Sequence, residues 1–103
     1  MGSGRQPVVW AGQASAALEE AVAYVWRDSP SVALELLQAA LDAAASLSTL
    51  WERGRVVPEV GSPAIRELFV LRYRLMYELR EEEIGVIAFV HGARDFRGSK
   101  DAT

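Results

Sequence analysis

The stretch RELFVLRYRLMYEL, residues 66–79, carries the pattern that decides the fold of this chain. Its alternating side chains, interrupted near Arg72, predict two β-strands over residues 65–71 and 73–79 joined by a tight turn. The two sides of the second strand carry different sets: Tyr73, Leu75, Tyr77 and Leu79 on one, Arg74, Met76 and Glu78 on the other. One sheet face should therefore be buried. The other fits either a solvated charge pattern or a surface for a polar target.

The segments on either side complete a small α+β domain. A third strand is predicted over residues 84–90, after an acidic turn at 80–83. Upstream, glycines and prolines mark residues 51–64 as a loop, and PVVWA, residues 7–11, reads as a first strand. With two helices between, the order is β-α-α-β-β-β, and the helical hairpin must cover one face of a small antiparallel sheet. The opposite face should stay at least partly open.

The two helices are predicted from three- and four-residue apolar spacing. The first begins near Ser15 and ends near Asp28, and the second runs from about Ser31 to Leu50. Between them, Ser29 is expected to be the N-cap of the second helix, because Pro30 fits the first turn of a new helix. Two helices joined by so short a turn form a hairpin.

Composition limits the classes of function. The 103 residues contain no cysteine, carry a formal net charge of −3 and are 50% hydrophobic. We expect one domain over residues 1–103, with residues 1–6 and 97–103 as flexible tails and a cytoplasmic location without membrane attachment. All but two of the 11 basic residues lie in the second half. Nonspecific nucleic-acid binding is disfavoured, because it depends on an excess of Lys and Arg. The sequence shows no motif for a metal or cofactor.

Three segments together resemble the RelE/ParE superfamily of bacterial type II toxins. They are GRVVPEVG (54–61), IRELFVLRYRLMYEL (65–79) and IGVIAFVHGARDF (84–96). The likeness extends from Trp10 to Phe96 and includes the order of elements. It implies a small toxin whose sheet face acts on a target and whose antitoxin partner wraps it with a helix and an extended segment.

The resemblance leaves two activities to weigh. RelE-like members cut mRNA on the ribosome with arginines, lysines and a terminal tyrosine or histidine, whereas ParE-like members inhibit DNA gyrase. Arg74 and Arg94 match the RelE-like arginines, Arg66 could replace one of two absent lysines, and His91 is the remaining candidate acid or base. The tail offers no tyrosine or histidine, and a pI of about 5.1 gives no electrostatic attraction to RNA.

The ParE-like interpretation is therefore preferred, with an RelE-like mRNA endonuclease or an inactive binding relative as alternatives. No catalytic residue is assigned under it. The residues expected to bind gyrase or the antitoxin are Arg66, Arg72, Arg74, Tyr77, His91 and Arg94. The expected partners are a cognate antitoxin and DNA gyrase, or the ribosome and mRNA under the alternative, within a homodimer or a toxin–antitoxin hetero-oligomer. The assignment requires Arg66, Arg74 and Arg94 to be grouped on accessible surface.

Overall fold

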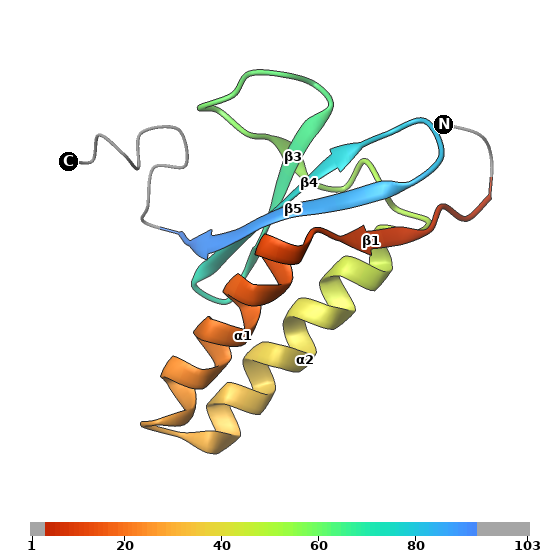
Figure 1. Ribbon diagram of the computed structural model, residues 1–103. Helices are drawn as coiled ribbons and strands as arrows, with labels where there is room; N and C mark the ends of the chain where they lie inside the picture. The colour runs from red at the N-terminus through yellow and green to blue at the C-terminus, as the bar shows by residue number, and fades with distance from the viewer. Residues whose placement is uncertain (1–3, 93–103) are drawn as a thin grey trace.

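The computed structural model describes residues 4–92 as two helices and a five-stranded sheet (Figure 1). In chain order the elements are β1 (Val8–Trp10), α1 (Gly12–Trp26), α2 (Pro30–Ser46), β2 (Arg55–Val56), β3 (Ile65–Val70), β4 (Tyr73–Leu79) and β5 (Ile84–His91). The α+β class and the predicted order of elements are confirmed, with β2 as an addition inside the predicted loop 51–64. Of the predicted tails, 97–103 and residues 1–3 lie outside the described residues. Gln6 is buried and its N–H donates to the carbonyl of Ser48, so it is not part of a flexible tail.

The sheet is mixed, which corrects the prediction of an antiparallel sheet. Its strand order is β1-β5-β4-β3-β2, and every neighbouring pair is antiparallel except β1 and β5. In that pair Val8 lies opposite Ile84 and Trp10 opposite Val86. The helical hairpin between β1 and the later strands returns the chain to the sheet, so β1 can lie parallel to β5. The alternation of side chains within a strand does not show whether its neighbour runs parallel or antiparallel to it.

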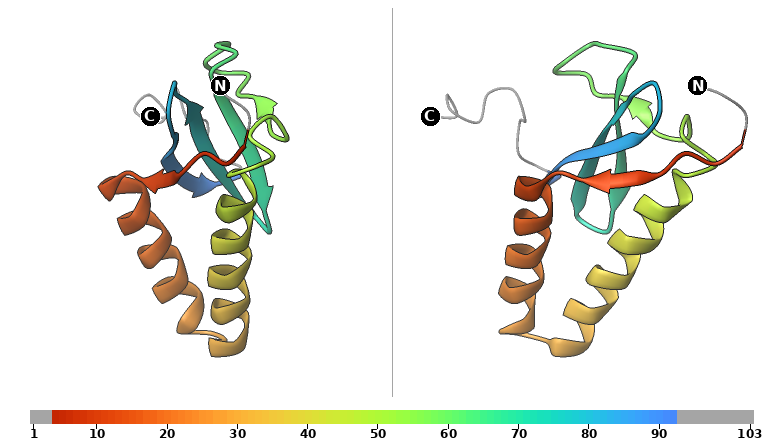
Figure 2. Two further views of the ribbon diagram at one scale, coloured as in Figure 1. Left: turned by 90° about the vertical axis from the view of Figure 1, so that its right-hand side faces the viewer. Right: turned by 45° about the vertical axis from the view of Figure 1, so that its right-hand side comes forward.

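The helices begin and end close to the predicted positions. Ser29 is the N-cap of α2, since its hydroxyl accepts a hydrogen bond from the N–H of Val32. Helix α1 begins at Gly12 because Ala11 is extended and its carbonyl accepts the N–H groups of Ala14 and Ser15. The turn between α1 and α2 lies well away from the strands in every view (Figures 1 and 2). The hairpin therefore extends beyond the sheet that it covers.

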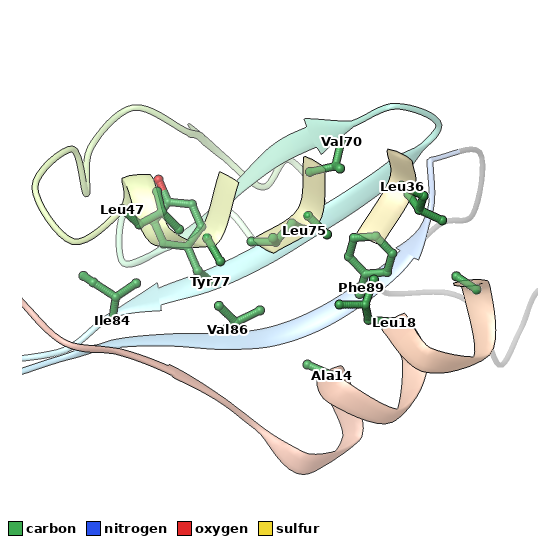
Figure 3. Close-up of a cluster of buried hydrophobic side chains, with 13 residues drawn as sticks. Ala14, Leu18, Leu36, Leu47, Val70, Leu75, Tyr77, Ile84, Val86 and Phe89 are labelled. Carbon is green, nitrogen blue, oxygen red and sulfur yellow. The ribbon is translucent and has the colours of Figure 1, made fainter. Parts of the chain in front are cut away.

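The core lies between the hairpin and one sheet face (Figure 3). Helix α1 contacts β5 and contributes Ala14 and Leu18. Helix α2 contacts β3 and contributes Leu36, and its C-cap residue Leu47 is also part of the core. The sheet supplies Val70, Leu75, Tyr77, Ile84, Val86 and Phe89. Small residues such as Ala40 and Ala44 on α2 are also buried, which allows close approach of the helix to its neighbours.

The other sheet face, which was expected to stay at least partly open, is partly covered by the segment that follows β2. The segment over residues 57–64 leaves β2 with Val57 fully buried, and the N–H of Gly61 closes a turn onto the carbonyl of Val57. Gly61 ends this turn with a φ of 75°, a conformation that glycine adopts without steric cost. On β4, Met76 and Arg74 of this face are both buried. The crossover loop, residues 51–64, is therefore a structural cover for the second face.

Within the described residues, neither helix is long and apolar enough to cross a membrane.

Candidate functional site

Arg74, expected on accessible surface, is buried between two carboxylates. Its guanidinium donates to both carboxylate oxygens of Glu59, at 2.7 and 2.9 Å, and to Glu67 Oε1 at 2.7 Å. The side chains of Arg74 and Glu67 are 5% and 0% exposed. The hydrogen bonds to Glu59 are the main reason why the pKa of Arg74 is raised above its ordinary value. Burial acts in the opposite direction and lowers this pKa. The expectation that Arg74 lies on accessible surface is therefore wrong, and a role for it in binding stays a prediction.

The same cluster extends to β2. Arg55 Nε donates to Glu67 Oε2 at 2.6 Å, and the Arg55 guanidinium lies over the ring of Phe69, 5.5 Å from its centroid. Two arginines and two glutamates thus form one hydrogen-bonded network with no formal net charge. This neutrality makes burial of the charges tolerable, because each has an opposite partner. Sequence reasoning missed Glu59 and Glu67 as partners of Arg74.

Tyr77 and Arg66 also bind the crossover loop rather than pointing to a target. The hydroxyl of fully buried Tyr77 donates to the carbonyl of Trp51 and accepts the N–H of Gly54, both at 2.9 Å. Burial raises the pKa of Tyr77 above its ordinary value of 10.0. A Cβ at Gly54 would lie 2.6 Å from that hydroxyl oxygen, which requires glycine there. Tyr77 therefore has a structural role in the fold, and a role for it in binding stays a prediction.

Arg66 is partly buried and holds the same segment through main-chain carbonyls. Its guanidinium donates to the oxygens of Pro63, Gly54 and Glu52 at 3.1, 3.2 and 3.5 Å. Arg66, Arg74 and Tyr77 therefore fasten the crossover loop to β3 and β4. Arg94, the third arginine of the predicted group, lies outside the described residues.

Arg72 and His91, in contrast, lie together at an apolar groove. The groove has a volume of about 450 Å³ and opens between the overhanging part of the helical hairpin and the adjacent ends of β4 and β5. We call it the hairpin groove, and its lining residues are Tyr24, Val25, Val32, Glu35, Leu36, Leu71, Arg72, Tyr73 and His91. Of these, Tyr24, Val32 and Leu71 are exposed large apolar side chains. An exposed apolar concavity of this kind is typical of a protein-binding site.

The wall that the sheet contributes to the groove is held by aromatic contacts. The Tyr73 ring stacks on that of Phe89 with centroids 5.0 Å apart and an angle of 8° between the planes. His91 meets Tyr73 edge to face at 5.5 Å. Because Phe89 belongs to the core, these contacts give the exposed wall a rigid support.

Among residues 4–92, no group of three or more His, Asp or Glu side chains is arranged to hold a metal ion.

The fold and the groove can now be compared with known proteins. A family model described as the ParE toxin of the type II toxin–antitoxin system parDE matches residues 8–96. The chain belongs to the ParE toxin family. The match spans both helices and all five strands, so family membership rests on the whole described fold.

A solved structure shares the fold of this ParE family member. A chain of the chromosomal ParDE toxin–antitoxin system from P. aeruginosa superposes with a TM-score of 0.69 at 20% sequence identity. The match covers 84% of this chain and 96% of that chain. No curated protein sequence gives a significant match.

Membership confirms the ParE-like assignment within the RelE/ParE superfamily. The chain is a ParE-like toxin of a type II system, and a cognate antitoxin is the class of partner that goes with it.

Proposed function

We propose that this ParE-family toxin inhibits DNA gyrase through protein contacts and is neutralised by an antitoxin that docks in the hairpin groove. The observation that carries the proposal is the match of the ParE family model to residues 8–96. The engagement of Arg74 with Glu59 and Glu67 supports it against RNA cleavage, since a guanidinium held by two carboxylates cannot stabilise a developing phosphate charge without first losing them. Gyrase as a target is consistent with a cytoplasmic location.

The groove supports the antitoxin part of the proposal by its chemistry. Apolar side chains of α1 and α2 line one wall. The β3–β4 turn, the first residue of β4 and the last residue of β5 line the other. An amphipathic helix is the form of peptide that such a groove accepts, with apolar residues three and four positions apart. The outer edge of β1, at the end of the sheet, is a second place where an extended segment could add.

A supercoiling assay tests the target. Purified protein added to gyrase and relaxed plasmid should reduce the supercoiled product in proportion to its concentration, and growing cells should filament after induction. Relaxation of the same plasmid by a type I topoisomerase is the control and should be unaffected. Unaffected gyrase would refute the proposal.

Sequencing the 5′ ends of cellular mRNA after induction identifies the alternatives. Codon-positioned cleavage on translating ribosomes would establish the RelE-like nuclease instead. Normal growth, with intact mRNA and active gyrase, would establish an inactive binding relative.

A further inference from the structure

Leu71 has a backbone conformation that is unfavourable for leucine. It is the first of the two residues that join Val70 of β3 to Tyr73 of β4, and its φ is 55°. No other non-glycine residue between positions 4 and 92 has a positive φ. A two-residue hairpin turn with positive φ at its first central position strongly favours glycine there. Leucine is strained in this left-handed region, because its Cβ approaches the following carbonyl oxygen.

The surrounding structure fixes this turn without burying the Leu71 side chain. The pair Val70 and Tyr73 sets the register on one side, and the N–H of Gly92 donates to the carbonyl of Arg72 at 2.7 Å on the other. The Leu71 side chain is 55% exposed. Core packing therefore does not account for a leucine at a position where glycine would be less strained.

Leu71 does line the hairpin groove, and the next residue adds a charge there. Arg72 is exposed, lines the same groove, and makes no ion pair with any other residue of the segment 4–92. The turn therefore presents an apolar side chain and an adjacent unpaired cation at the rim. A complementary partner would offer an apolar side chain together with a carboxylate.

We propose that Leu71 and Arg72 determine antitoxin specificity: Leu71 is held in a strained turn so that its side chain contacts an apolar residue of an amphipathic antitoxin segment, and Arg72 pairs with a carboxylate of that segment. This inference rests on the proposed docking of an antitoxin in the hairpin groove. It assigns the recognition to two residues of the β3–β4 turn that the fold itself does not need.

The test compares affinity with stability in the same variant. The probe is the purified protein encoded by the reading frame adjacent to this gene, titrated against the full chain. Leu71→Asn keeps a residue that tolerates the left-handed region but removes the apolar side chain. It should weaken binding at least about tenfold while Tm stays the same or rises. The matched control is Leu50→Asn, since Leu50 is 56% exposed and does not line the groove; it should bind like the wild type.

Arg72→Gln tests the charge. Its affinity should be lower than that of the wild type at low salt, and the difference should shrink at high salt, because exposed ion pairs are screened. A difference independent of salt, or no difference, would overturn the carboxylate assignment.

The outcomes separate this inference from the proposed function. Equal binding by wild type and Leu71→Asn would overturn the role of Leu71 and leave the antitoxin proposal standing, whereas a wild type that does not bind the probe would overturn both. A fall in the Tm of Leu71→Asn would overturn the strain argument. Self-association of the wild type that Leu71→Asn abolishes would identify a second copy of the chain as the occupant and refute the antitoxin assignment.

Discussion

At the scale of single residues, the side chains with most hydrogen-bonding capacity serve the fold. Arg66, Arg74 and Tyr77 all direct their polar atoms to the crossover loop. A buried guanidinium needs several acceptors, and the two carboxylates satisfy Arg74 from two directions. The described structure leaves no buried side-chain nitrogen or oxygen without a partner. The buried polar atoms of Arg74 and Glu67 are therefore satisfied by side chains of the fold.

Removal of Arg74 should reveal this structural role. Arg74→Ala leaves Glu59 without its bidentate partner and leaves one oxygen of fully buried Glu67 unpaired. Breaking a buried pair in this way costs about 3–5 kcal/mol, so the free energy of unfolding in urea should fall by that amount. Arg72→Ala is the control, and it should change the free energy of unfolding by less than about 0.5 kcal/mol. Equal effects of the two substitutions would show that the network does not stabilise the fold.

Part of the cluster around Arg74 could be predicted from the sequence. A two-residue turn at 71–72 pairs Phe69 with Arg74 and Glu67 with Met76, which puts Glu67 and Arg74 diagonally adjacent on one face. The alternation also put Tyr77 with Leu75 on the buried side. Glu59, however, reaches Arg74 only because the loop folds back over the sheet, and no periodic pattern reports such a return. Arg74 alone therefore resembled a functional arginine.

At the scale of elements, the crossover loop is the part that sequence patterns describe least well. The helices and long strands follow from their 3.6- and 2-residue periods. Strand β2 has only two residues, Arg55 and Val56, and lies among glycines and prolines, so its pairing with β3 leaves no periodic signal. The parallel pairing of β1 with β5 likewise depends on how the chain returns to the sheet and leaves no pattern in the residues of β1. Local patterns thus predicted the elements but not how the loop and the first strand are arranged.

The attachment of this loop to β4 should depend on pH. The pKa of Tyr77 is raised in the folded protein, so in alkali the unfolded state releases its proton first. The stability that Tyr77 provides is complete below its ordinary pKa of 10.0 and is lost as pH rises through the raised folded-state value. Tyr77→Phe removes the hydroxyl's two hydrogen bonds and should lower the free energy of unfolding by about 1–2 kcal/mol near pH 7.

Urea unfolding of the wild type and of Tyr77→Phe over a pH series measures the stability that the Tyr77 hydroxyl provides. The difference between wild type and Tyr77→Phe should shrink above about pH 10. Tyr24→Phe is the control, because Tyr24 is 66% exposed, and it should match the wild type at every pH. A constant difference between wild type and Tyr77→Phe would contradict the assigned cause.

At the scale of the whole molecule, the charge balance separates this toxin from nucleic-acid-binding proteins. The formal net charge is −3, and the pI is about 5.1. Within the described residues, Arg55, Arg74 and Arg80 are already paired with carboxylates. The net negative charge disfavours binding that depends on the displacement of counterions from a phosphate backbone. The proposed inhibition of gyrase should therefore act through contact with the enzyme and not through the DNA.

The corresponding measurement is direct binding to DNA. A labelled duplex at about 150 mM salt should show no saturable binding below roughly 100 µM protein, the weak end of nonspecific affinities. The same preparation should inhibit supercoiling, which confirms that it is active. Saturable binding to the duplex at low micromolar concentration would contradict the inferred mode of action.

The parallel pair of β1 and β5 has a consequence for when the molecule becomes functional. Val8 can meet Ile84 only after almost the whole described chain has been synthesised. Pairings so distant along the chain form late and slow folding, because a long loop must close first. Helix α1, which packs on β5, lacks this partner until then, whereas α2 can already pack on β3. A chain that ends before β5 therefore lacks His91 of the hairpin groove and the strand that joins β1 to β4, so it should not complete the sheet.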